Sequence, residues 1–284
     1  MKPLPFLNPA AGTPAARNPA RPAVIVPTQG VDSEELSAQC AAVAATGVVD
    51  VIEWRIDPLL ARSIAGGSLN DEAPAVVSGE VPGSAAPRAE EVLELLPQAA
   101  AAGLPVLLTA RTAGEGGLVE IAADEYAEVL RRLIAGLADA EVGAVPVAID
   151  VEIDRAEARE LIASAREHGI PTIASLHDFE STGSYEALLA TFRSMADAGA
   201  DVAKAAMMPQ TPADVCRLLA ATAKADVMLG VPVLGISMGA LGRTSRIMGA
   251  DFGSCATFAQ IGEASAPGQI DAARLAEILD RVCD

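Results

Sequence analysis

The sequence predicts an α/β fold, namely a (β/α)8 barrel in a single domain. From about residue 22 onward, short apolar runs alternate with longer segments of helical period, which is the pattern of strands and helices around a parallel sheet. Eight such units occupy about 260 residues, the usual size of this barrel. Of the 284 residues, 51% are hydrophobic, which is enough for a large core. A doubly wound open sheet has the same alternation and is the competing fold.

The individual elements follow from this alternation in chain order. Each predicted strand is a short apolar run, and the strands occupy residues 23–27, 48–53, 105–109, 145–150, 171–175, 202–206, 231–236 and 253–256. Most are followed by a segment rich in Ala, Leu, Glu and Arg, and these predicted helices occupy residues 33–45, 89–102, 124–138, 155–168, 184–198, 212–223 and 271–281. The segment after the seventh strand is rich in glycine, which disfavours a helix there.

Two segments lie outside the alternation. Residues 1–20 are rich in Pro and Ala and are predicted to be a flexible leader, which leaves residues 21–284 for the barrel. Residues 63–87 contain Gly, Ser and Pro and are predicted to be a long surface connection.

Charge and cysteine usage restrict the function. With 38 acidic and 20 basic residues the formal net charge is -18, so the chain lacks the basic surface that a nucleic-acid partner requires. No apolar run approaches the roughly 20 residues that span a bilayer, and residues 1–20 lack the apolar core of a signal peptide. We therefore expect a cytoplasmic protein that binds neither nucleic acid nor membrane. The four cysteines are far apart, as expected for thiols in a reducing compartment, and no group of residues has metal-ligand spacing.

Lys204 is the sharpest signal of chemistry. The chain has only three lysines, and this one interrupts the apolar run 201–208. Burial and neighbouring cations lower the pKa of an amine, and the neutral amine can then add to a ketone to form a Schiff base. The alternative is a structural lysine that is paired inside the barrel with Glu53 or Asp150.

Other polar residues are predicted at the same mouth of the barrel, beyond the carboxyl ends of the strands. His177 follows the fifth strand, where its imidazole could exchange protons near neutral pH or could simply bond to Asp178 in a loop. Arg55, Arg111 and Arg246 follow three other strands. They could hold a carboxylate or the hydroxyls of a small polar ligand, or form surface ion pairs.

Three further patterns point less directly to chemistry. His168 ends a predicted helix just before Gly169, and capping of that helix accounts for it. Asp150 and Glu152 alternate along one strand, which keeps a glycosidase open but leaves the lysine without a role. The glycines around Arg246 are a weak phosphate-loop pattern. Since there is no GxGxxG after the first strand and no Walker lysine, no nucleotide is predicted.

Taken in order, these residues resemble the type I 3-dehydroquinate dehydratases, the Schiff-base class of the shikimate pathway of aromatic amino acid biosynthesis. The resemblance runs from Val24 to Gln269. Its motifs are Asp50-Val51-Ile52-Glu53-Trp54-Arg55, Thr109-Ala110-Arg111, Glu115-Gly116-Gly117, Ile149-Asp150-Val151-Glu152, Ser175-Leu176-His177-Asp178-Phe179, Asp201-Val202-Ala203-Lys204, Ser245-Arg246, Phe252-Gly253-Ser254 and Ala266-Pro267-Gly268-Gln269.

The resemblance implies a TIM barrel and a carbon–oxygen lyase that dehydrates 3-dehydroquinate to 3-dehydroshikimate. It also implies a homodimer without metal or organic cofactor. Lys204 would form the imine, His177 would be general base and acid, and Glu115 would orient the imidazole. The substrate contacts that it implies are Glu53, Arg55, Arg111, Arg246, Ser265 and Gln269. Some members carry a serine at the end of the first strand, where this chain has Pro27 and Thr28, so that contact is left open.

Two other functions share the barrel and the lysine. Another class I Schiff-base lyase or aldolase would use a different acid–base partner and need not have Arg246 or Gln269. A metabolite-binding barrel without turnover would keep the pocket, but the intact pair of Lys204 and His177 argues against it. The sequence does not distinguish a biosynthetic role from a role in quinate breakdown.

Overall fold

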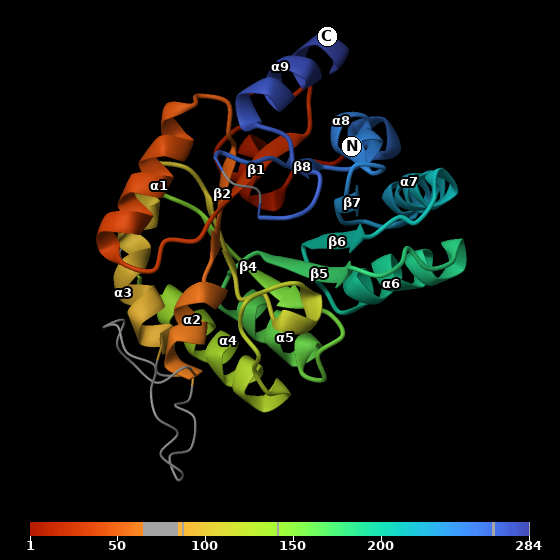
Figure 1. Cartoon of the computed structure of the whole chain (residues 1–284). Coiled ribbons are helices and arrows are strands. Elements are labelled where there is room, and N and C mark those ends of the chain that lie inside the picture. Colours follow the sequence, from red (N-terminus) through yellow and green to blue (C-terminus); the bar gives the residue numbers. More distant parts are fainter. Residues whose placement is uncertain (65–84, 87, 141, 263–264, 284) are drawn as a thin grey trace, which may run out of the picture.

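A computed structural model of the chain describes residues 1–64, 85–86, 88–140, 142–262 and 265–283. Within them, eight parallel strands form one sheet in the order β7-β6-β5-β4-β3-β2-β1-β8, and helices surround it (Figure 1). The strands are β1 (Ala23–Thr28), β2 (Val51–Arg55), β3 (Val106–Thr109), β4 (Val147–Glu152), β5 (Thr172–Asp178), β6 (Val202–Met207), β7 (Val233–Ser237) and β8 (Ala256–Phe258). The α-helices are α1 (Ser33–Ala45), α2 (Asp57–Ile64), α3 (Arg88–Ala100), α4 (Ala123–Leu137), α5 (Ala158–Glu167), α6 (Tyr185–Asp197), α7 (Pro212–Met228), α8 (Arg243–Ile247) and α9 (Ala272–Cys283).

The sheet closes between β7 and β8. Val233 and Ser254 form a parallel bridge there, and the amide of Cys255 donates to the carbonyl of Val233 at 2.9 Å. Closure brings the carboxyl ends of all the strands to one mouth. The predicted (β/α)8 barrel is therefore confirmed, and the doubly wound open sheet is not formed.

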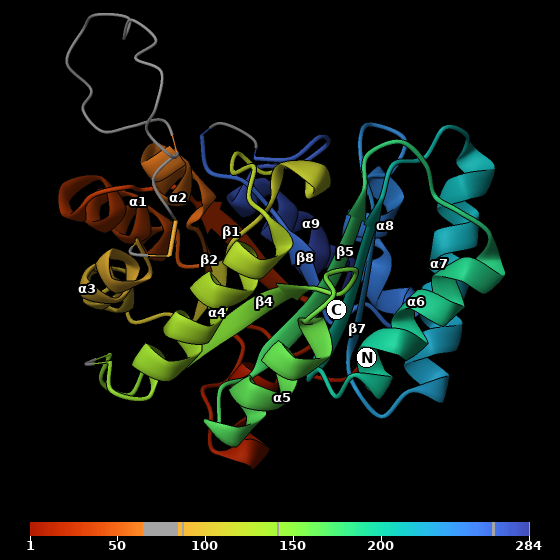
Figure 2. The ribbon, with the colours of Figure 1, turned by 90° about the horizontal axis from the view of Figure 1, so that it is seen from below.

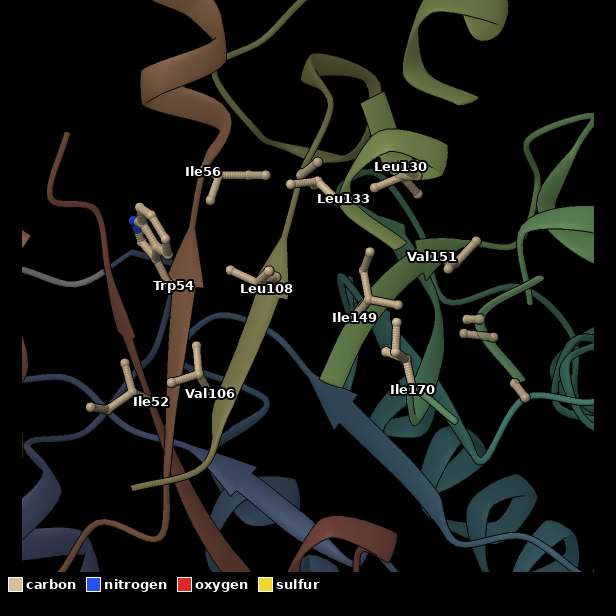
Figure 3. Packing of buried hydrophobic residues seen from close by; sticks show 14 of the residues in the cluster. Ile52, Trp54, Ile56, Val106, Leu108, Leu130, Leu133, Ile149, Val151 and Ile170 are labelled. Carbon is tan, nitrogen blue, oxygen red and sulfur yellow. The ribbon is translucent and has the colours of Figure 1, made fainter. Parts of the chain in front are cut away.

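The larger core lies between the outer face of the sheet and the helices (Figure 3). Ile52, Trp54, Leu108 and Ile149 are each 0% exposed, and they belong to one buried cluster with Leu133 of α4. Alternate side chains of a strand point to opposite faces. The outward positions are therefore apolar, which ties the helices to the barrel and leaves the inward positions to build a site.

The inner face of the barrel changes from apolar to polar along the strands. Its lower layer, near the amino ends, includes Val51, Leu107, Ala148, Ile173 and Val202. Two residues further along the same strands stand the buried polar residues Glu53, Thr109, Asp150, Ser175 and Lys204. Because side chains two residues apart point the same way, a polar layer lies on the apolar one.

The first residues pack under the barrel, which differs from the flexible leader predicted for residues 1–20. Leu4, Phe6 and Leu7 are buried in the same cluster as the lower layer, and the 3-10 helix η1 (Pro5–Leu7) carries two of them. The amide of Arg17 donates to Asp50 Oδ1 at 2.6 Å. In Figure 2 this segment, in red, lies below the strands. Its apolar side chains cover interior groups that would otherwise face water, and this burial holds the segment in place.

Several predicted boundaries are shifted, and α2 and α8 were not predicted. β5 extends to Asp178, beyond the predicted end at residue 175, because the barrel interior accepts polar residues that interrupt an apolar run. β8 is Ala256–Phe258 and shares only residue 256 with the strand predicted at 253–256. Of the predicted connection at 63–87, residues 63–64 end α2, and residues 65–84 and 87 lie outside the described residues. Among the helices of the described ranges, none has the length and apolar character needed to cross a membrane.

Candidate active site

A pocket opens at the carboxyl ends of the strands. All nine residues that were predicted for the site line it, namely Glu53, Arg55, Arg111, Glu115, His177, Lys204, Arg246, Ser265 and Gln269. The other lining residues are Gly116, Phe179, Ala206, Ile236, Met238, Phe258 and Ala266. The structure therefore brings the predicted polar residues together and adds an apolar wall that comes mainly from β6 to β8.

Lys204 lies on the inner face of β6 and is only 3% exposed. Its Nζ lies 4.4 Å from the centroid of the Phe258 ring. In the part of the chain that the structure describes, Nζ forms no ion pair within 4.0 Å, so the alternative of a lysine paired with Glu53 or Asp150 is not realised. Burial lowers the pKa of Lys204, although Glu53 and Asp150 act in the opposite direction. The geometry is that of an amine available for addition to a carbonyl.

His177 and Glu115 form a hydrogen-bonded pair in the pocket. His177 Nδ1 lies 2.8 Å from Glu115 Oε2. The same oxygen accepts from the His177 backbone amide and from Arg111 Nη1, each at 3.1 Å. Burial, followed by Arg111 and Lys204, lowers the pKa of His177 well below its usual value. Burial raises the pKa of Glu115 to about 8, although Arg111 opposes this. Both shifts disfavour charged forms, so the resting imidazole is neutral.

Arg111 forms hydrogen bonds to the acidic residues of β4 and to Glu115, the partner of His177. Its Nη1 donates to Glu115 and to Glu152, each at 3.1 Å. Nη1 also donates to Ser175 at 3.0 Å, and Nη2 donates to Asp150 at 2.7 Å. Burial acts to lower the pKa of Arg111, but the surrounding carboxylates outweigh it and raise the pKa. Asp150 and Glu152 do not line the pocket, which disfavours a glycosidase, because both of its carboxylates must face the substrate.

Arg55 and Glu53 come from the end of β2. Arg55 donates through Nε and Nη2 to the two oxygens of Asp57, at 2.6 and 2.8 Å. Among the described residues, Nη1 of this guanidinium has no hydrogen-bond partner and is therefore left for a ligand. Glu53 Oε1 accepts from Thr109 Oγ1 at 3.0 Å, which fixes the carboxylate in the polar layer.

Arg246 comes from α8 and is fixed by backbone carbonyls. Its Nη1 donates to the carbonyl of Phe258 at 3.2 Å, and Nη2 donates to that of Pro267 at 3.0 Å. Nε is buried and has no hydrogen-bond partner in the described ranges. Burial lowers the pKa of Arg246 to about 10, so the residue is a cation at neutral pH. The amide of Ser265 donates to Gln269 Oε1 at 2.9 Å, which joins the two ends of the neighbouring loop.

Sequence reasoning missed two aromatic residues of the pocket. Phe258 lies on β8, whose predicted range ended two residues earlier. Phe179 follows β5 and packs on Gly116, where an added Cβ would lie 2.3 Å from a carbon of the ring. Both residues stand at the end of a strand, and Phe179 also belongs to the motif Ser175-Leu176-His177-Asp178-Phe179; these are the sequence signals that could have found them. Pro27 and Thr28, which replace the serine of some family members, do not line the pocket.

Comparison with known proteins decides which family this site belongs to. The family model described as Type I 3-dehydroquinase matches residues 24–282. The chain belongs to the type I 3-dehydroquinase family. The match covers nearly the whole barrel, so the resemblance seen in the sequence motifs is confirmed, and with it the predicted dehydratase function.

Two relatives named 3-dehydroquinate dehydratase are similar to this chain over most of their length. The 3-dehydroquinate dehydratase of Lactiplantibacillus plantarum is 36% identical over 253 residues, which are 88% of each chain. That of Shouchella clausii is 35% identical over 267 residues, 92% of each chain. Neither of these relatives supports the alternative of an aldolase.

Two solved structures of the family have the same fold as this chain. The 3-dehydroquinate dehydratase of Geobacillus kaustophilus superposes with a TM-score of 0.74 at 28% identity, over 92% of this chain and 91% of that one. The type I enzyme of Clostridium difficile, described with covalently modified comenic acid, has a TM-score of 0.74 at 28% identity, over 93% and 92% of the two chains.

Proposed function

We propose that Lys204 is the amine that forms the Schiff base when this enzyme dehydrates 3-dehydroquinate to 3-dehydroshikimate. The observation that carries the proposal is a buried amine that faces a pocket and has no carboxylate partner in the described part of the chain. The neutral amine adds to the substrate ketone, a C–N bond forms, and water leaves to give an iminium. The iminium accepts the electron pair of the adjacent C–H bond, which is the difficult step of the dehydration.

His177 is proposed as the general base and acid. With Nδ1 held by Glu115, Nε2 is the atom that exchanges protons with the substrate. It takes the proton from the carbon next to the iminium, and the electron pair moves toward the nitrogen of Lys204. The pair returns as the C–O bond breaks, and the hydroxyl leaves as water with the proton from Nε2. A second water then hydrolyses the imine and restores the free amine.

The remaining predicted residues are proposed to hold the substrate. Arg246 suits the carboxylate, because its guanidinium is fixed by two carbonyls and its Nε has no partner in the described residues. Glu53 and Nη1 of Arg55 suit the ring hydroxyls. Arg111 is proposed on the same hydroxyl side, where it also holds the buried carboxylates. The 265–269 loop would cover the substrate and exclude water.

We also propose that the enzyme works in the cytoplasm as a homodimer without metal or organic cofactor. The family resemblance of the sequence supports the dimer and the absence of a cofactor, and the buried free thiols of Cys40 and Cys255 fit a reducing compartment. Sedimentation velocity of the purified chain tests the dimer, and a single monomeric species over the micromolar range would contradict it.

Borohydride reduction in the presence of 3-dehydroquinate tests the assignment of the amine. We expect one covalent substrate adduct per chain, located on Lys204 by peptide mass spectrometry. Lys204→Ala should lose both the adduct and the activity, whereas Lys224→Ala, at an exposed position, should keep both. An adduct on another residue, or turnover by Lys204→Ala, would contradict the proposal. His177→Ala should still form the imine but lose a factor of roughly 100 to 10,000 in turnover.

A further inference from the structure

We propose that Phe258 is a positioning residue for Lys204: its aromatic face is the seat that holds the nitrogen, first as the amine and then as the iminium. The inference rests on the role proposed above for Lys204. Phe258 carries no charge and exchanges no proton. Its proposed role is to keep the amine of Lys204 free of a carboxylate partner and to stabilise the iminium that forms from it.

The contacts of Lys204 are the first step of the argument. The side chain is 3% exposed and Phe258 is 5% exposed, so water is largely excluded from both. Nζ lies over the ring, 4.4 Å from its centroid, which is well inside the roughly 6 Å within which cation–π attraction acts. Glu53 and Asp150 are close enough to affect the amine electrostatically, yet neither forms an ion pair with it. The ring therefore takes the place that a carboxylate has beside most buried lysines.

A ring suits this place better than a carboxylate would, because the two act differently on the two states of the nitrogen. A carboxylate in contact would hold the ammonium and oppose the loss of the proton that addition to the ketone requires. The face of a ring attracts positive charge through its quadrupole but accepts no proton. When water leaves the neutral adduct, positive charge forms on the same nitrogen as the iminium, so the attraction acts on the intermediate as it is formed.

The backbone of Phe258 fixes the ring and links it to the other end of the substrate. Phe258 pairs with Ile25 of β1 in the sheet, and its carbonyl accepts from Arg246 Nη1 at 3.2 Å. One residue of β8 thus supports the amine through its side chain and the proposed carboxylate-binding guanidinium through its main chain. The distance between the amine and the guanidinium is therefore set in part by this residue.

A series of fluorinated phenylalanines at position 258 of the full chain tests the role of the ring face. Site-specific incorporation of 4-fluoro-, 3,5-difluoro- and 3,4,5-trifluorophenylalanine withdraws electron density in steps and changes the shape little. The measurements are kcat and the fraction of enzyme that borohydride traps as an imine at saturating 3-dehydroquinate. We expect both to fall stepwise, by about 10-fold at trifluorophenylalanine, within the range that cation–π strengths allow. The main-chain carbonyl of residue 258, which binds Arg246, is the same in every variant. The affinity for an analogue of 3-dehydroquinate in which an alcohol replaces the ketone should therefore not change.

The matched control is trifluorophenylalanine at Phe192, which is 0% exposed in α6 and should leave every value unchanged. Phe258→Leu, checked for folding by urea unfolding, should lower the trapped fraction at least as far as the trifluoro variant. A flat fluorine series, or a Phe258→Leu enzyme with an unchanged trapped fraction, would overturn the inference. If unaltered enzyme is trapped on a residue other than Lys204, the proposed function itself fails. Trapping on Lys204 with a flat series refutes only the role of the ring.

Discussion

Substitution of Arg111 by methionine tests how much the buried ion cluster contributes to stability. Arg111 is 2% exposed, and its guanidinium donates to three carboxylates and one hydroxyl at 2.7 to 3.1 Å. Methionine fills the space of the aliphatic stem but supplies no charge. Removal of one partner of a buried ion pair costs about 3 to 5 kcal/mol, whereas the whole free energy of unfolding of a domain is about 5 to 15 kcal/mol. We expect Arg111→Met to lower the free energy of unfolding by about 3 to 5 kcal/mol.

The loss of unfolding free energy in Arg111→Met should become smaller as the pH falls. Burial raises the pKa of Glu115 to about 8 even with Arg111 acting against it, and without the guanidinium the opposing effect is lost. A carboxyl whose pKa is higher in the folded state takes up a proton on folding. It therefore favours folding below its unfolded pKa, and this contribution is lost as the pH rises through the folded pKa. The difference between Arg111→Met and the unaltered chain should thus be larger near pH 8 than near pH 5.

Urea unfolding followed by the fluorescence of Trp54, the single and fully buried tryptophan, measures the difference at both pH values. The control is Arg131→Met, because the Arg131 side chain is 48% exposed in its pairs with Glu128 and Glu157. Such an exposed pair contributes at most about 1 kcal/mol. If Arg111→Met also loses less than about 1 kcal/mol, or if its deficit is the same at both pH values, the reasoning about buried charge is refuted.

Three further substitutions test other parts of the molecule. Glu115→Gln should leave the acidic limb of the kcat/KM profile in place, because burial raises the pKa of Glu115 to about 8 and lowers that of His177, so Glu115 is already uncharged where His177 takes up a proton; a limb that moves to lower pH would contradict this. Arg246→Gln should raise KM by roughly 10- to 100-fold, the size of a charged hydrogen bond, while saturating substrate is still trapped; an unchanged KM would assign the carboxylate elsewhere. Phe6→Ala should cost about 3 to 5 kcal/mol of unfolding free energy, because Phe6 is 1% exposed, whereas Leu118→Ala, at 63% exposure, should cost under about 0.5 kcal/mol. Equal small losses would show that the leader contributes little.

Elements with local end signals could be predicted from the sequence. α1 was predicted at residues 33–45 and occupies Ser33–Ala45. Asp32 accepts from the Glu35 amide at its start, and Gly47 follows its end with a φ of 70°. β5 was predicted to end at residue 175 but continues to Asp178, because the interior of the barrel provides partners for polar residues that interrupt the apolar run.

The membership of the pocket could be predicted for a different reason. The carboxyl ends of parallel strands converge, so a polar residue at each end is enough to suggest a shared site. The contacts inside it could not be predicted. The position of Lys204 over Phe258 joins β6 to β8, which are brought together by closure of the barrel, and the hydrogen bond from Arg111 to Asp150 depends on how side chains of neighbouring strands pack in the interior. The burial of Phe6 could not be predicted, because the cluster that it joins is assembled from residues of many strands, from Ala23 of β1 to Phe258 of β8.

The two walls of the pocket offer unequal freedom to anyone who redesigns this enzyme for another hydroxy ketone. Toward β6 and β7 the apolar part of the lining includes Ala206, Ile236 and Met238, and volume-conserving exchanges among apolar side chains are usually tolerated. Toward β3 to β5, a change at Arg111 leaves several acidic groups buried without compensation. Substitutions that fit a substrate of another shape should therefore be made on the apolar wall, while Arg111 and the acidic residues around it are kept unchanged.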